Sequence, residues 1–82
     1  MKLKIVSKKD SANIQIIDMS AVFMTQQYKG EMLELYIKQM PDSLCFNCKD
    51  YSFFEIEHTV GGYVSYVPRT IPEIVTLYAI TD

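Results

Sequence analysis

The sequence predicts a small α+β domain in which one amphipathic helix packs on an antiparallel sheet of four to five strands, in the order ββαβββ. Three observations lead to this fold: apolar residues alternate near the N-terminus, a helical repeat follows in the middle of the chain, and a Gly-Gly pair separates two β-rich runs. Residues 1–82 are expected to form a single compact domain, because the chain has no repeat or linker and 49% of it is apolar.

The first two elements are predicted to be the strands of a hairpin. Residues 2–7 alternate Lys2 and Lys4 with Leu3 and Ile5, which is the period of a strand with one buried face. A polar turn over residues 8–11 then leads into the β-branched run NIQIIDM.

Residues 26–40 change to a helical period. Their large apolar side chains recur at i, i+4, i+7, i+8 and i+12, the spacing of one helix face: Tyr28, Met32, Leu35, Tyr36 and Met40. Glu34 and Lys38 form a supporting i,i+4 pair, and Pro41 ends the segment. We therefore expect the amphipathic helix here.

Gly61 and Gly62 predict a two-residue hairpin loop, because the turns that match the twist of a hairpin need positive φ. In this register Ile56 opposes Val67, and Phe54, Ile56 and His58 lie on the core face. The opposite face is expected to meet solvent or a partner. Its side chains include two carboxylates and two aromatic rings: Phe53, Glu55, Glu57, Val64 and Tyr66.

The C-terminal segment TIPEIVTLYAITD fits two structures. Thr70 and Glu73 have the spacing of a capping box, and Pro72 suits the first turn of a short helix. The β-branched run over residues 74–76 is typical of a strand instead. We expect a strand over residues 72–80, with a helix as the alternative.

The two cysteines, Cys45 and Cys48, form a C-x-x-C motif. Thiolates at this spacing provide half of a zinc site, and the chain offers a single histidine, His58, as a further ligand. A redox pair would need the start of a helix, whereas this motif precedes a predicted strand. We interpret both as ordinary thiols without a cofactor; a zinc-stabilised module using Cys45, Cys48 and His58 is the alternative.

The sequence contains no arrangement of residues that is typical of an enzyme. It has no P-loop or G-x-G-x-x-G motif, and no Ser-His-Asp ordering. His58 is expected to pack in the hairpin. Glu55 and Glu57 would lie about 7 Å apart on an open strand, where carboxylates are normally solvated. We predict that the protein is not an enzyme.

Charge points to protein partners and not to nucleic acid. The net charge is −2, and residues 10–82 carry ten acids against four bases, so most of the chain attracts basic surfaces. The N-terminus lacks the apolar segment of a secretory signal, and no stretch approaches the roughly 18 apolar residues of a membrane span. We therefore expect a cytoplasmic protein without a membrane partner.

The predicted function is non-catalytic protein binding. Six tyrosines favour an interface, and the excess of Phe, Tyr, Ile, Asn and Lys over Gly, Ala, Arg and Pro is typical of AT-rich phages and mobile elements. We expect a phage protein that binds and inhibits a host defence or nucleic-acid-processing factor, in the host cytoplasm, by placing an acidic, tyrosine-bearing face against a basic groove.

Two further expectations accompany this prediction. An exposed edge strand in so small a domain is compatible with a homodimer. The alternative function is single-stranded nucleic-acid binding through the basic N-terminus, at Lys2, Lys4, Lys8 and Lys9.

Overall fold

The computed structural model describes residues 2–78, which form two antiparallel sheets and a C-terminal helix. The elements are β1 (Lys2–Ser7), β2 (Ile14–Asp18), the 3₁₀ turn η1 (Met19–Ala21), β3 (Val22–Tyr28), β4 (Met32–Ile37), β5 (Leu44–Asn47), β6 (Tyr51–His58), β7 (Val64–Arg69) and α1 (Ile71–Leu77). The four-stranded sheet has the order β2-β1-β6-β7, and the three-stranded sheet the order β3-β4-β5. The α+β class is thus confirmed in broad terms, but the number and order of the strands differ from ββαβββ.

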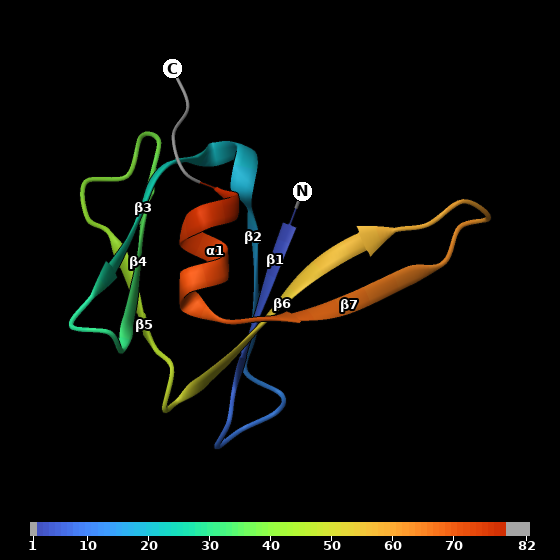
Figure 1. Cartoon of the computed structure of the whole chain (residues 1–82), viewed down its shortest axis with the longest axis horizontal. Helices are drawn as coiled ribbons and strands as arrows, with labels where there is room; N and C mark the ends of the chain where they lie inside the picture. Colours follow the sequence, from blue (N-terminus) through green and yellow to red (C-terminus); the bar gives the residue numbers. More distant parts are fainter. Residues whose placement is uncertain (1, 79–82) are drawn as a thin grey trace.

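The helix α1 lies between the two sheets, and the β6–β7 hairpin extends away from them (Figure 1). Ile71 and Ile74 of α1 are buried against both sheets in one cluster. The strands β1 and β4 each contribute two residues at a spacing of two to this cluster, as the pleat requires, and β2, β5 and β6 contribute one each. The buried hydrophobic residues are Leu3, Ile5, Ile17, Met19, Leu33, Leu35, Phe46, Phe53, Ile71 and Ile74.

The predicted first hairpin is confirmed by β1 and β2, which pair antiparallel with Leu3 opposite Ile17. Its apolar residues Leu3 and Ile5 are fully buried, while Lys2 and Lys4 lie on the opposite face of the sheet. The period-2 pattern therefore identified both the strand and its two faces.

The predicted helix over residues 26–40 is wrong. This segment contains the last three residues of β3, 26–28, and all of β4, joined by a turn in which Lys29 and Gly30 have φ values of 51° and 72°. A helix at this position would have left Leu33 and Ile37 outside its apolar stripe. The strand buries Leu33 and Leu35 together, at a spacing of two, and both are completely inaccessible.

The predicted two-residue loop at Gly61-Gly62 is also wrong. The loop has three residues, Val60–Gly62, and is closed by a hydrogen bond from the Thr59 N–H to the Tyr63 carbonyl at 2.8 Å. Both glycines have positive φ, 99° and 85°, as expected for a tight loop. His58 pairs with Val64 in place of Ser65, and this slip of one residue moves β7 to the other face relative to β6.

The C-terminal segment is a helix, so the prediction of a strand over residues 72–80 is wrong where the structure describes it; residues 79–82 lie outside the described part. The Thr70 hydroxyl accepts from the Glu73 N–H, while the Glu73 carboxylate accepts from the Thr70 N–H. This capping box and the proline in the first turn stabilise a helix start more than the β-branched run favours a strand.

Candidate interaction surface

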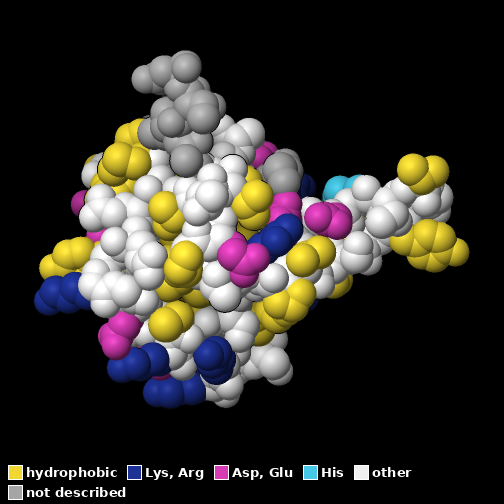
Figure 2. Space-filling model, viewed as in Figure 1, with side chains coloured by type: hydrophobic (Ala, Val, Ile, Leu, Met, Phe, Trp, Pro, Cys, Tyr) yellow, Lys and Arg dark blue, Asp and Glu magenta, His cyan; other side chains and the backbone are white. Residues whose placement is uncertain are grey.

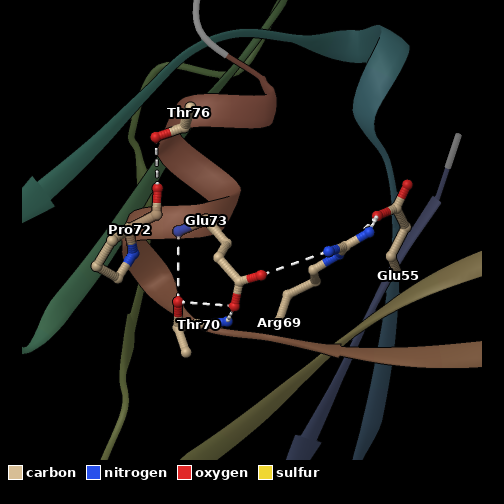
Figure 3. A network of polar contacts seen from close by, with 6 residues as sticks. All are labelled: Glu55, Arg69, Thr70, Pro72, Glu73 and Thr76. Carbon is tan, nitrogen blue, oxygen red and sulfur yellow. Dashed lines mark hydrogen bonds and ion pairs between the residues drawn. The ribbon is translucent and has the colours of Figure 1, made fainter.

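Glu55 is buried in an ion pair, and this determines which face of β6 is exposed. Its residue accessibility is 2%, and its Oε2 accepts a hydrogen bond from Arg69 Nε at 2.8 Å and lies 2.7 Å from Nη2 in an ion pair. Arg69 also lies 3.4 Å from Glu73 of the capping box, so one guanidinium joins β6, β7 and α1 (Figure 3). The Glu55 carboxylate is the first cause of the raised pKa of Arg69.

The expectation that Phe53 and Glu55 face solvent is therefore wrong. Phe53 is a core residue, and Glu55 is held inside by the cation of Arg69, which compensates the carboxylate for its loss of water. The other three predicted site residues are exposed: Glu57, Val64 and Tyr66. Val64 and Tyr66 share one face of the hairpin, whereas Glu57 projects from the other, beside Ser65.

The side of the four-stranded sheet opposite α1 forms an apolar surface, which we call the outer face. One row across the strands runs Ile16, Lys4, Phe54 and Pro68, and the next runs Asp18, Lys2, Ile56 and Tyr66. Ile16 is 51% exposed and Tyr66 52%, because none of the described residues covers them. The apolar residues of the outer face are Val6, Ile14, Ile16, Phe54, Ile56, Val64, Tyr66 and Pro68.

The charged groups on the outer face are mainly cationic. Lys2 and Lys4 project from β1, and the Lys4 ammonium lies 4.3 Å from the centroid of the Tyr66 ring, in cation–π geometry. Asp18 lies at the edge, where hydrogen bonds from the Ser20 hydroxyl and N–H lower the pKa of its carboxyl. The acidic, tyrosine-bearing face that the sequence predicted is thus replaced by an apolar face with central lysines.

The end of the β6–β7 hairpin extends the outer face beyond the body of the sheet. The β1 register ends with Lys2 opposite Ile56, so no third strand of the described chain pairs with the hairpin further out. Its loop carries a fully exposed Val60, and Tyr63 is 75% exposed. Figure 2 shows hydrophobic side chains at the end of this projection. We call residues 59–63 the hairpin tip.

The exposed side of the three-stranded sheet is different in character, because its polar groups bind one another. The Tyr36 hydroxyl donates to Glu34 Oε2 at 3.0 Å, which is the first cause of the raised pKa of Tyr36. Glu34 also lies beside Ser43 and directly opposite Cys45. Apolar groups are present, including Phe23, but they are mixed with these polar contacts, as is usual for a solvated face.

A groove of about 410 Å³ lies beside the start of α1, with Tyr51, Phe53, Ile71 and Pro72 among its lining residues. Its volume falls within the range of ligand pockets, about 300 to 1,000 Å³. Both of its cationic side chains are engaged internally: Arg69 with Glu55, and Lys8 through a 2.9 Å hydrogen bond from Nζ to the Cys48 carbonyl. The groove therefore supplies apolar walls but gives no indication of a reaction.

The structure does not bring together the ligands of the alternative zinc site. Cys45 is exposed on the three-stranded sheet, and Cys48 packs against the core in the turn that follows. His58 lies near the hairpin tip, paired with Val64. Within residues 2–78, no three His, Cys, Asp or Glu side chains gather in a way that could hold a metal ion.

The N-terminal lysines do not form one patch. Lys2 and Lys4 lie on the outer face, whereas Lys8 and Lys9 belong to the loop after β1, where the Lys8 N–H bonds to the Asp50 carbonyl. The strand between Lys2 and Lys8 spans roughly 20 Å.

Sequence reasoning also missed Ile14, Ile16, Phe54 and Ile56 as surface residues; the alternation that places Lys2 and Lys4 on one face of β1 was the available signal.

Comparisons with protein-family models, with curated proteins and with solved structures give no significant match to this chain. No helix in the described part of the chain has the length and apolar character that crossing a bilayer requires.

Proposed function

We propose that this protein is a non-catalytic recognition module whose outer face binds another protein. The observation that supports this function is the apolar side of the β2-β1-β6-β7 sheet, which nothing in residues 2–78 covers. The other side of the same sheet is sealed by α1 and by the three-stranded sheet. A domain with one sheet face fully buried and the other apolar but exposed is suited to adding a further layer from a partner.

The size of the outer face is appropriate for recognition. Four strands about 4.8 Å apart, each contributing about five residues at roughly 3.3 Å, make a face of roughly 300 Å² in projection. The largest apolar patch on a typical monomer measures about 300 to 600 Å² and is often functional, so a face of this size is compatible with an interaction site. The hairpin tip enlarges the surface with Val60 and Tyr63, whose burial would add to the affinity.

The hairpin end is itself difficult to explain without a partner. A two-stranded ribbon without a third strand gains little stability from its own contacts. This ribbon nevertheless exposes the apolar side chains of Val60, Tyr63 and Val64, and removing such side chains from water lowers the free energy. Contact with a partner at the hairpin tip would supply the apolar burial that the ribbon lacks.

The composition favours a phage or mobile-element protein, which would bind a host factor in the cytoplasm and block it. The cationic centre of the outer face changes the expected partner. A basic groove would meet Lys2 and Lys4 there with like charge, so the partner surface for this face must be of another kind.

Single-stranded nucleic-acid binding is a second candidate, favoured by one observation. The outer face places Phe54 and Tyr66 beside Lys2 and Lys4, and aromatic rings interleaved with cations form platforms for bases and phosphates. Binding of oligo(dT) that weakens steeply with added salt and is lost in Lys2→Gln/Lys4→Gln would support this candidate.

The experiment that tests protein recognition uses two matched double variants. Ile16→Ser/Tyr66→Ser removes apolar groups from the outer face, and Phe23→Ser/Tyr28→Ser removes similarly exposed groups from the other sheet. Tagged proteins are used to capture partners from a nuclease-treated bacterial lysate. We expect the wild type and the Phe23/Tyr28 variant to retain one stoichiometric protein that the Ile16/Tyr66 variant loses. Retention by the Ile16/Tyr66 variant would exclude the outer face as the binding surface.

A further inference from the structure

We infer that the partner segment bound to the outer face is acidic and places a carboxylate against Lys4, which deepens the proposed function and depends on it. The inference starts from where Lys4 lies. It projects from β1, an inner strand of the sheet, between Ile16 of β2 and Phe54 of β6. Pro68 continues the same row, so the ammonium stem rises from the middle of the apolar surface and not from its rim.

A partner that covers the apolar rows must also cover Lys4. Removing an ammonium from water is costly unless an anion or several acceptors replace the hydration shell. The Tyr66 ring, 4.3 Å from Nζ, compensates one side of the group. In the part of the chain described, no carboxylate lies within ion-pair distance of Lys4. The ion pairs there have Lys49 or Arg69 as the cation. None of residues 2–78 supplies this anion, and we assign it to the partner.

A second copy of this chain does not meet that requirement. Two outer faces packed together would bring Lys2 and Lys4 of one copy toward the same lysines of the other, which is unfavourable. Among the described residues the acid on this face is Asp18, on the edge strand β2 opposite Lys2, so two packed faces would bring four lysines together with two carboxylates. The charge pattern thus favours a heterologous partner over the homodimer that the sequence suggested.

The rest of the face favours a protein segment over nucleic acid. Five of its eight apolar side chains are aliphatic: Val6, Ile14, Ile16, Ile56 and Val64. Aliphatic groups pack well against aliphatic and aromatic protein side chains but provide no stacking platform for bases. The chemistry that fits is a segment with apolar side chains around an Asp or Glu.

The probe for this inference is a random dodecapeptide library, displayed and selected against three immobilised proteins: the wild type, Lys4→Glu and Lys38→Glu. Lys38 is an exposed lysine that follows β4 in the other sheet, so it controls for net charge. We expect the wild type and Lys38→Glu to enrich apolar peptides with an excess of Asp and Glu, and Lys4→Glu to enrich peptides with Lys and Arg. An enriched acidic peptide should bind Lys4→Glu at least tenfold more weakly than it binds the wild type.

The milder variant Lys4→Gln keeps the result interpretable if Lys4→Glu perturbs the fold, and it should weaken the same peptides in the same direction. Enriched peptides without an acidic excess, or with unchanged affinity for both Lys4 variants, would overturn the inference. If those peptides still lose binding to Ile16→Ser/Tyr66→Ser, the outer face remains the recognition surface. If they do not, the proposed surface fails as well. Salt-sensitive binding of oligo(dT) that requires Lys4, with no peptide enriched, would replace the protein segment by nucleic acid.

Discussion

Arg69 of β7 donates a hydrogen bond from Nε to Glu55 Oε2 on β6 at 2.8 Å, and its Nη2 lies 2.7 Å from the same oxygen in an ion pair. The side chain of Glu55 is almost completely buried and that of Arg69 mostly so. Because Arg69 also contacts Glu73, the pair fixes the start of α1 against the four-stranded sheet. It makes Glu55 part of the framework and leaves the other face of β6 for recognition.

Removing the cation of this pair should strongly destabilise the fold. Arg69→Ala leaves the Glu55 carboxylate buried without a partner, and such losses cost about 3 to 5 kcal/mol. The free energy of unfolding, from urea denaturation, measures the effect. Lys49→Ala is the control, because its pair with Glu31 is exposed and contributes less than about 1 kcal/mol. Equal effects of the two substitutions would show that Glu55 is solvated.

Replacing both partners should cost far less than removing one. Glu55→Leu/Arg69→Met substitutes apolar groups for a buried ion pair, and such exchanges are often neutral or stabilising. Urea denaturation of the double variant should therefore give a stability close to that of the wild type. A double variant as unstable as Arg69→Ala would mean that the pair does more than satisfy its own charges.

The capping box should account for about 1 kcal/mol of the stability. Thr70→Ala removes the acceptor for the Glu73 N–H at the start of α1, and losses of this kind are typically about 1 kcal/mol. Thr76→Ala is a matched control within the helix, since the Thr76 hydroxyl only bonds back to the Pro72 carbonyl and alanine is the better helix former. A Thr70→Ala melting temperature equal to that of the control would contradict this account of the helix start.

Acid should weaken the helix start. Hydrogen bonds from the Thr70 N–H and hydroxyl, followed by the contact with Arg69, hold the pKa of Glu73 below its ordinary value of 4.5. A carboxyl with a lowered pKa in the folded state stabilises the protein above its unfolded pKa, and this contribution is lost as the pH falls through the folded value. Stability should therefore decline below about pH 4.5, and less so in Glu73→Gln.

An NMR titration tests this cause directly. The Glu73 carboxyl should titrate below 4.5 in the wild type and return toward 4.5 in Thr70→Ala, which lacks the hydroxyl donor. Titration at the ordinary value in both proteins would mean that the capping box does not form in solution.

Cross-strand nuclear Overhauser effects should establish the hairpin register. The structure pairs His58 with Val64 and Glu57 with Ser65, across a three-residue loop. The two-residue loop suggested by the sequence would instead pair His58 with Ser65. Contacts between the backbone protons of His58 and Ser65 as directly opposed residues would instead move Val64 and Tyr66 to the side of Glu55, and the proposed outer face would lose both residues.

Local patterns in the sequence predicted some elements and missed others for identifiable reasons. The alternation in β1 was reliable because one face of that strand is apolar and the other carries lysines. The β3–β4 segment satisfied much of the helical period as well as the strand period, and Leu33 and Ile37, which fall outside the helical stripe, distinguished them. A short apolar run often leaves this choice open, and here the packing of Leu33 and Leu35 determined it.

The candidate site was missed because charge alone decided the assignment of the faces. Glu55 and Glu57 made their side of β6 look solvated, and the buried cation that holds Glu55 comes from Arg69, fourteen residues away. A register error of one residue then exchanged the faces of β7. Two predicted residues, Val64 and Tyr66, still lie on the proposed surface because the wrong face of β6 and the slip of β7 cancel each other for this strand.

Site-specific photo-crosslinking tests the central claim most directly. A benzoylphenylalanine at position 16 or 66 would lie on the outer face, and one at position 23 on the far side of the three-stranded sheet. We predict that the first two crosslink to the same partner protein in cells and that the third does not. Crosslinks from position 23 alone, with none from positions 16 and 66, would contradict recognition through the outer face.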